Sequence, residues 1–257
     1  MTALVTGAGQ RLGRAMALYL ARRGHDVAVH YASSEAGALQ VVAEIEAMGR
    51  KAVALQADLL DEASVESLIP RAQAALGALD VLVNNASIFE YDRIDTATRD
   101  SWDRHIGSNL RAPYLLIQAF ARQCPKLGYD AAGEPLASGL VVNMLDQRIW
   151  KPTPEFSTYT IAKMGLWALT QTAAQGLAPQ IRVNGIGPGP TLQGARQSAA
   201  HFANQRAATI LGRGANESDI TAALGFFLDS PGVTGQMIAV DGGQHLAWKT
   251  PDVLGVE

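Results

Sequence analysis

The sequence predicts a single α/β domain over residues 1–257, a doubly wound parallel sheet of about seven strands flanked by helices. Short apolar runs alternate with longer stretches in which apolar residues recur at helical spacing. Strands that alternate with helices need crossover connections, which give a parallel sheet covered on both faces. The 257 residues, 48% of them hydrophobic, supply ample core for such a domain.

The expected elements follow one another as strand and helix pairs. The apolar runs predict strands at residues 3–5, 26–30, 51–56, 79–83, 139–143, 181–184 and 236–240. The helical patterns predict helices near residues 12–20, 35–48, 62–76 and 102–123, and one that carries Tyr159 and Lys163. In the first helix, Leu12, Met16 and Tyr19 share one side, as a helix packed on a sheet requires.

Two stretches interrupt this alternation. Residues 125–138 are rich in Gly, Ala and Pro, which predicts an exposed loop. Residues 188–214 follow the sixth strand and are rich in small side chains, which is typical of a movable lid. We expect the lid itself at about residues 190–212, where it would shape the substrate pocket.

Composition excludes several classes of function. A net charge of -3 argues against a nucleic-acid or anionic-membrane partner. Cys124 is the only cysteine, so an intramolecular disulfide and a cysteine metal cluster are excluded. The five histidines lack metal-binding spacing, so no metal site is expected. The sequence shows no targeting signal and no apolar run of membrane-spanning length, and we therefore expect a cytoplasmic protein.

The turn between the first strand and the first helix is rich in glycine. Residues 6–13 read Thr-Gly-Ala-Gly-Gln-Arg-Leu-Gly. Glycines let the backbone approach a pyrophosphate, while the helix N-terminus offers unpaired N–H groups. A glycine-rich turn without a ligand is the alternative, but the position between strand and helix favours a dinucleotide site.

The end of the second strand indicates which dinucleotide. A site specific for NAD usually places an acidic residue there, whereas residues 30–34 read His-Tyr-Ala-Ser-Ser. Without a carboxylate to repel a 2′-phosphate, and with Arg11, Ser33 and Ser34 available, NADP(H) is the expected cofactor. The alternative, that the two serines cap the next helix, is compatible with this role.

Tyr159 and Lys163 are four residues apart and share one helix face. A nearby cation favours the phenolate, so we expect the pKa of Tyr159 to fall toward neutral pH. A phenol tuned in this way can donate and accept a proton in a reaction. Asp146 stands thirteen residues before the tyrosine.

Together these features resemble the short-chain dehydrogenase/reductase family over essentially the whole chain. The matching elements are residues 6–13, Asp58, residues 84–86, Asn109, Tyr159 with Lys163, Pro188 with Gly189, and residues 234–243. The resemblance implies a Rossmann-type fold and a homotetramer with the tyrosine helix at an interface. It implies that Asp58 touches the adenine, that Asn84 stabilises the central strands, and that Asn109 holds a water of a proton relay. Lys163 would bind the nicotinamide ribose.

Two departures from the common family pattern point to its pteridine reductase branch. Arg11 replaces a glycine of the usual turn, and Asp146 replaces the usual catalytic serine. Further segments that resemble the branch are residues 30–31, 85–87, 89, 143–144 and 242–246. The resemblance implies that Arg11 and Ser87 help to bind cofactor phosphate or pterin, and that Phe89 stacks on the pterin ring. A hydrophobic plug under the lid is the alternative for Phe89, and Ser33 stands where the branch often has arginine.

The resemblance implies a full set of site residues. The catalytic residues would be Asp146, Tyr159, Lys163 and Asn109. The cofactor contacts would be Gly7, Arg11, Leu12, Gly13, His30, Tyr31, Ser33, Ser34, Asp58, Leu59, Asn85, Ala86, Ser87, Tyr159, Lys163, Pro188 and Gly189. The substrate contacts would be Arg11, Ser87, Phe89, Asp146 and Tyr159.

The function expected from this set is NADPH-dependent reduction of a pteridine such as dihydrobiopterin, dihydromonapterin or dihydrofolate. Hydride would reach a carbon of a ring C=N bond, and Tyr159 would protonate the nitrogen with the help of Asp146. One alternative is reduction of a carbonyl in an oxoacyl thioester, a sugar or a steroid; a carboxylate at Asp146 would oppose the developing alkoxide. Another is a non-catalytic NADP-binding regulator, which would not need Tyr159, Lys163 and Asn109.

Overall fold

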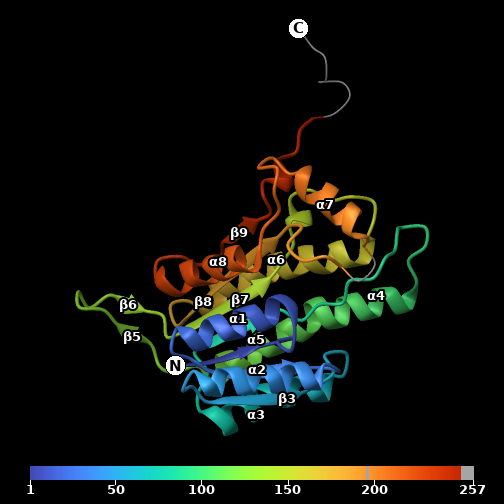
Figure 1. Ribbon diagram of the computed structural model, residues 1–257. Coiled ribbons are helices and arrows are strands. Elements are labelled where there is room, and N and C mark those ends of the chain that lie inside the picture. Colours follow the sequence, from blue (N-terminus) through green and yellow to red (C-terminus); the bar gives the residue numbers. More distant parts are fainter. Residues whose placement is uncertain (195–196, 250–257) are drawn as a thin grey trace.

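The centre of the computed structural model, which describes residues 1–194 and 197–249, is a seven-stranded parallel sheet (Figure 1). Its strand order is β3-β2-β1-β4-β7-β8-β9, and every pair is parallel. The strands are β1 (Thr2–Val5), β2 (Asp26–Tyr31), β3 (Ala52–Gln56), β4 (Val81–Asn84), β7 (Gly139–Met144), β8 (Ile181–Pro188) and β9 (Met237–Val240). The strand order reverses between β1 and β4, which is where sheets of this kind bind ligands. The predicted α/β fold is confirmed.

Helices cover both faces of the sheet (Figure 1). They are α1 (Arg11–Arg22), α2 (Glu35–Ala47), α3 (Glu62–Leu76), α4 (Arg99–Ile106), α5 (Ala112–Gln123), α6 (Ser157–Leu177), α7 (Ala199–Ala207) and α8 (Glu217–Asp229). Buried side chains of α1, α2 and α8 form one core, and those of α3, α5 and α6 form a second core on the other face. Alternation along β1 sends Leu4 into the second core and Val5 into the first.

The helix predicted at residues 102–123 is interrupted in the structure. α4 ends at Ile106, a π-helical turn spans Gly107–Arg111, and α5 follows. Pro113 has no N–H to donate to the carbonyl of Asn109, so the α-helical ladder cannot pass this point. The interruption places Asn109 in the π-helical turn, beside the site described below.

Two predicted loops contain secondary structure. Residues 125–138 form a hairpin of β5 (Gly128–Tyr129) and β6 (Pro135–Leu136), whose turn is closed by Asp130 accepting from the N–H groups of Ala132 and Glu134 at 2.8 and 2.9 Å. The predicted lid contains α7, and its residues 195–196 lie outside the described residues.

The sixth strand, predicted at residues 181–184, continues to Pro188. Within this longer strand, Gly185 lies close to the Leu145 side chain: a Cβ on Gly185 would be 2.3 Å from it.

Candidate active site

Most of the predicted site residues lie at or just beyond the carboxyl ends of β1, β2, β3, β4, β7 and β8. Gly7 follows β1, Ser87 and Phe89 follow β4, and Asp146 follows β7. The carboxyl ends of parallel strands meet at one edge of a sheet, so segments far apart in sequence converge there. Tyr159 comes to the same edge from the first turn of α6.

The glycine turn after β1 is built against the end of β4. The hydroxyl of Thr6 accepts from the N–H groups of Asn85 and Ala86 at 2.8 and 2.9 Å. The Asn85 amide donates to the Thr6 carbonyl at 2.8 Å. Gly7 has a φ of +62°, and a Cβ on Gly13 would lie 2.1 Å from the Gly7 carbonyl. The turn therefore requires glycine at both positions, and Asn85 acts as its brace.

The N-terminus of α1 fits a bound pyrophosphate. No acidic residue lies in its first turn, and among the described residues the N-cap, Gln10, makes no side-chain capping bond. Its N–H groups therefore remain available to an anion, and the positive end of the helix dipole favours one. Arg11 adds a positive charge at the same place.

His30 supports this turn from beneath. Its side chain is buried, and Nδ1 accepts from the Gly7 N–H at 3.0 Å. The ring proton must then sit on Nε2, which donates to the carbonyl of Ala57 at 3.1 Å. Burial lowers the pKa of His30 to about 4, so the ring is neutral at neutral pH. Both ring nitrogens thus bind backbone and support the turn, and the predicted cofactor contact of His30 remains a prediction.

The buried neutral His30 should make the protein sensitive to acid. Its folded pKa of about 4 lies below the unfolded value of 6.5, so this stability is complete above about pH 6.5 and is lost toward pH 4. The loss should reach about 3 kcal/mol. His30→Gln keeps an acceptor without titrating, so it should flatten the dependence of the unfolding free energy on pH in this window. Equal slopes in chemical denaturation of both proteins would contradict this role.

The residues after β2 and β3 include those expected to contact the adenine and the 2′-phosphate of the cofactor. Ser33 is exposed, and a Cβ on Gly9 would lie 2.6 Å from the Ser34 hydroxyl, so Ser34 borders the glycine turn. The Tyr31 hydroxyl donates to Glu35 at 3.3 Å. The Asp58 carboxylate accepts from the backbone N–H of Leu60 at 2.9 Å. These contacts do not test the predicted cofactor contacts of Ser33, Ser34 and Asp58, which remain predictions.

Leu12 and Leu59 pack into the protein core. Leu59 is buried in the core formed by α3, α5 and α6, and Leu12 packs against the core on the opposite face. Any cofactor contact at Leu59 is therefore limited to its backbone.

At the end of β8, Pro188 closes the strand and the Gly189 N–H donates to the carbonyl of Val240 at 3.0 Å.

Arg11 connects the glycine turn to the predicted lid. Its guanidinium donates to the carbonyls of Gln193 and Leu192 at 2.8 and 3.2 Å. Its backbone has a φ of +53°, which a non-glycine residue adopts only when its surroundings enforce it. The sequence indicated a phosphate or pterin contact for Arg11 and gave no sign of this link to the lid.

Tyr159 and Asp146 form a hydrogen-bonded pair. The phenol donates to Asp146 Oδ2 at 2.9 Å, and the backbone N–H of Arg148 donates to Asp146 Oδ1 at 2.8 Å. Lys163 Nζ is buried and donates to the carbonyl of Met144 at 2.7 Å. Nζ lies 5.6 Å from the centre of the Tyr159 ring. The structure thus brings together three of the four predicted catalytic side chains.

The predicted fall in the pKa of Tyr159 is wrong for this structure. Burial, then the charge of Asp146 and its hydrogen bond, raise the pKa well above the usual value. The neighbouring Lys163 donates to the carbonyl of Met144, and burial lowers the pKa of Lys163 to about 8. Burial also raises the pKa of Asp146. A phenol that keeps its proton is suited to act as an acid.

Asn109 binds backbone with both ends of its amide. Oδ1 accepts from the Ile88 N–H and Nδ2 donates to the Ile88 carbonyl, each at 2.8 Å. Its side chain therefore anchors the segment after β4, and its predicted role in holding a water of a proton relay remains a prediction. The π-helical turn aims the amide at that segment.

Phe89 stacks on an aromatic residue that the sequence analysis did not select. The rings of Phe89 and Phe156 are 4.2 Å apart at an interplanar angle of 11°. The ring centres of Phe89 and Tyr159 lie 4.7 Å apart in an edge contact, so Phe89 connects the Tyr159 ring to this stack. The guanidinium of Arg148 lies 5.0 Å from the Phe156 ring. The nearby Ser87 hydroxyl donates to the carbonyl of Ile88 at 3.3 Å.

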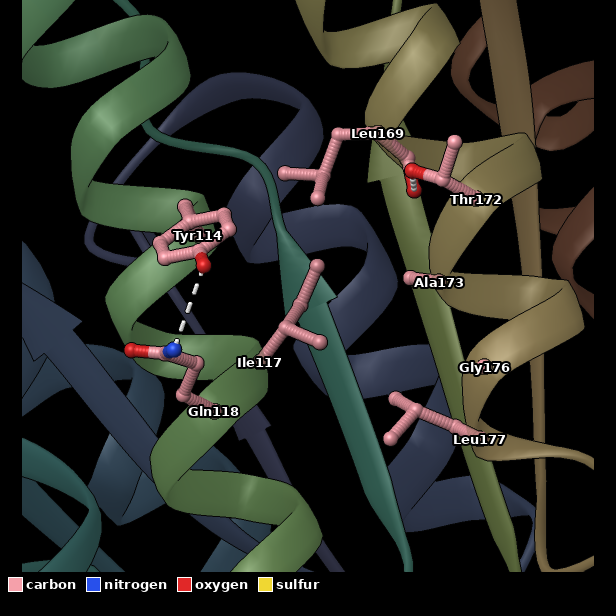
Figure 2. Close-up of a pocket in the computed structure, with 8 residues that line it drawn as sticks. All are labelled: Tyr114, Ile117, Gln118, Leu169, Thr172, Ala173, Gly176 and Leu177. Atoms are coloured by element: carbon pink, nitrogen blue, oxygen red, sulfur yellow. Dashed lines mark hydrogen bonds between the residues drawn. The ribbon is translucent and has the colours of Figure 1, made fainter.

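A separate shallow groove lies between α5 and α6 (Figure 2). Tyr114 and Gln118 line it from α5, with their side chains hydrogen-bonded at 3.3 Å. Leu169, Ala173 and other residues of α6 form the opposite wall. None of the lining residues belongs to the predicted site. The subunit interface that the resemblance implies at the tyrosine helix remains a prediction.

Within residues 1–194 and 197–249, no helix combines the length and apolarity needed to cross a membrane. No group of three or more His, Cys, Asp or Glu side chains there is placed to hold a metal ion.

Comparison with known proteins supports a nucleotide-dependent reductase. The family described as enoyl-(acyl carrier protein) reductase matches residues 7–245. FolM alternative dihydrofolate reductase 1 from Brucella suis, solved in complex with NADP, is 40% identical with a TM-score of 0.91, and the match covers 98% of each chain. A short chain dehydrogenase from Burkholderia cenocepacia, also with NADP, is 34% identical with a TM-score of 0.85 over 95% of this chain and 97% of that one. The 3-oxoacyl-[acyl-carrier-protein] reductase FabG of Staphylococcus aureus is 32% identical over 95% of this chain and 98% of its own length.

Proposed function

This chain belongs to the short-chain dehydrogenase/reductase family as an NADP-dependent oxidoreductase, and we propose that its substrate is a pteridine. The observation that carries the proposal is the placement of Phe89 against Tyr159, at 4.7 Å, with Asp146 bonded to the phenol. A flat heteroaromatic ring can stack on Phe89 while its nitrogen meets the phenol. The 40% identity to a protein named dihydrofolate reductase supports the same substrate class.

The chain's residues have distinct tasks in this reaction. Bound NADPH supplies the hydride, which goes to the carbon of a ring C=N bond. Tyr159 gives its proton to the nitrogen of the same bond. Asp146, whose pKa is raised by burial, can carry a proton from solvent to the phenolate that remains. Lys163 would hold the nicotinamide ribose, and the predicted lid at residues 190–212 would cover the substrate.

A carbonyl substrate is the second candidate, and the FabG relative at 32% identity favours it. Carbonyl reduction develops negative charge on oxygen, and donors near that oxygen stabilise the transition state. Asp146 supplies an acceptor at this place instead of a donor whenever it is ionised. Its charge therefore favours protonation of nitrogen over stabilisation of an alkoxide. A non-catalytic regulator would not need the pairing of Tyr159 with Asp146.

A substrate panel tests the proposal. The purified protein is assayed with NADPH against dihydrobiopterin, dihydromonapterin, dihydrofolate and a 3-oxoacyl thioester. We expect at least one pteridine to give a kcat/KM more than tenfold above the thioester. A preference for the thioester would support the carbonyl candidate, and NADPH binding without turnover of any substrate would support a regulator. A homotetramer in the cytoplasm remains part of the proposal.

Replacing Phe89 with alanine should weaken pteridine binding and leave the cofactor unaffected. The change removes one face of the proposed stack, which is worth about 1–3 kcal/mol for a base on an aromatic side chain. The pteridine KM should rise about 5- to 100-fold, while the NADPH dissociation constant stays within twofold. Phe226, an exposed phenylalanine on α8, provides the control variant Phe226→Ala. An unchanged pteridine KM would mean that Phe89 only plugs the site.

The residues after β2 should set the preference between NADPH and NADH. His30 to Ser34 contain no carboxylate, so a 2′-phosphate meets no like charge there. We expect a kcat/KM at least tenfold higher with NADPH, which corresponds to about 1.4 kcal/mol. Ser33→Asp should reverse or remove this preference, and Ser33→Asn is its uncharged control. Equal use of both cofactors by the wild-type protein would refute the assignment.

A further inference from the structure

The helix that carries Tyr159 receives its N-terminal cap from a distant segment. Phe156 occupies the N-cap position of α6 with a φ of +57°, and its side chain cannot accept a hydrogen bond from the helix. Asp92, which is 2% exposed, supplies the acceptors instead. Its carbonyl accepts from the Phe156 N–H at 2.8 Å, and its carboxylate accepts from the Thr158 N–H at 3.2 Å. A carboxylate at this end of α6 also complements the helix dipole.

A directed chain of hydrogen bonds extends this cap to α4. The N–H of Glu90 donates to Nε2 of buried His105 at 3.1 Å, so the ring proton sits on Nδ1. Nδ1 then donates to the Thr158 hydroxyl at 2.7 Å, and that hydroxyl donates to Asp92. Each donor in the chain has its acceptor, and the chain ends on a carboxylate.

The charges of this cluster agree with that direction. Burial lowers the pKa of His105, which keeps the imidazole neutral with one acceptor nitrogen. Burial alone would raise the pKa of Asp92, but the hydrogen bonds from Thr158 hold it below its usual value. The cluster is therefore a neutral histidine and an ionised carboxylate bridged by one hydroxyl.

We propose that Asp92, His105 and Thr158 are positioning residues that fix Tyr159 relative to Phe89. Phe89 lies three residues before Asp92, and Tyr159 directly follows Thr158, so the cluster joins the two segments next to both rings. The His105 ring itself lies 6.0 Å from that of Tyr159. The proposal rests on Tyr159 as the proton donor and does not depend on a pteridine substrate.

Loss of the Thr158 hydroxyl would disturb the cluster because its neighbours cannot reach water. The Nδ1–H of His105 would lose its acceptor, and one oxygen of Asp92 would lose its donor. Buried groups without partners reorganise to find new ones. Displacement of a reacting group by about 1 Å can lower a rate about 100-fold.

Thr158→Val is the direct test, because valine keeps the shape of threonine without its hydroxyl. Thr158→Ser restores the hydroxyl. Thr172→Val is the matched control, since this exposed threonine of the same helix bonds, among the described residues, only to the carbonyls of Ala168 and Leu169. The readouts are kcat with the best substrate of the panel, the NADPH dissociation constant, the melting temperature, and the ¹⁹F NMR resonance of Tyr159 in protein labelled with 3-fluorotyrosine. Its loss in Tyr159→Phe identifies the resonance.

We expect Thr158→Val to lower kcat about 10- to 100-fold, to shift the Tyr159 resonance, and to leave NADPH binding within twofold. Thr158→Ser and Thr172→Val should resemble the wild type in all of these. A lower melting temperature with unchanged kcat and resonance would reduce the cluster to a structural role and overturn the proposal. If Thr158→Val does not fold, Asp92→Asn, which removes one acceptor from the cluster, is read in the same way. The resonance reports on the phenol without a substrate, so the result stands even if the pteridine assignment fails.

Discussion

Replacing Tyr159 with phenylalanine should lower kcat by about 10²- to 10⁴-fold, the range for removal of a general acid. Under the proposed function the buried phenol at the edge of the Phe89 ring donates the proton, and its raised pKa keeps it protonated throughout the neutral range. Phenylalanine preserves the ring and its edge contact, so substrate KM and NADPH affinity should change little. Steady-state kinetics and a binding titration with NADPH measure these quantities separately.

Ser157→Ala, two residues before Tyr159 in the first turn of the same helix, is a control for nonspecific disturbance of α6. If Tyr159→Phe retained more than a tenth of the wild-type kcat, another group would have to donate the proton. That result would refute the assignment of Tyr159 and leave the cofactor assignment intact.

Asp146→Asn should lower kcat about 100-fold, because the amide keeps the shape but cannot carry a proton to Tyr159. The charge of Asp146 raises the pKa of Tyr159, so its removal should lower that pKa. The variant should therefore lose activity at a lower alkaline pH than the wild type does, because the acid deprotonates earlier. A pH profile of kcat tests the direction of this shift in the alkaline limb.

The double variant of Asp146→Asn and Tyr159→Phe should be little worse than the worse single variant, because residues that act as a unit are not additive. Multiplicative losses would mean that Asp146 acts independently of the phenol.

Asp146→Ser distinguishes the two substrate classes, since it restores the serine common among relatives that reduce carbonyls. We expect it to lose pteridine turnover under the proposed function and to keep or gain ketone activity under the alternative. Pteridine reduction that survives this change would make the carboxylate incidental, and the assignment would then reduce to an NADP-dependent reductase of unspecified substrate.

Local sequence patterns were sufficient for the fold and for the placement of the glycine turn. The turn requires glycine because of its own backbone, as the φ of Gly7 and the contact at Gly13 show, so its composition reveals it. The spacing of Tyr159 and Lys163 also placed both on one helix face. Spacing alone could not show where the ammonium points. The ammonium donates to the carbonyl of Met144 at the end of β7, while burial and the charge and hydrogen bond of Asp146 raise the pKa of Tyr159 instead of lowering it.

Residues whose partners are distant in sequence were not predictable in the same way. The histidine at position 30 suggested a cofactor contact, but its partners Gly7 and Ala57 belong to other segments. The cap of α6 comes from Asp92, 66 residues before Thr158. Phe156 carried only a weak signal, an aromatic residue just before the tyrosine helix in a polar, proline-containing run. Such roles depend on which segments the sheet order brings together.

The β5–β6 hairpin offers a practical point of attachment to the molecule. It immediately precedes β7 in the chain, so it lies at the amino end of that strand, whereas the site lies at the carboxyl ends (Figure 1). Its turn is closed by the carboxylate of Asp130, Tyr129 is 66% exposed, and the Cα of Gly133 faces open space. Exposed turns with small residues tolerate inserted sequence best. A peptide tag or surface anchor inserted here would hold the protein with the carboxyl ends of its strands, where the candidate site lies, turned away from the support.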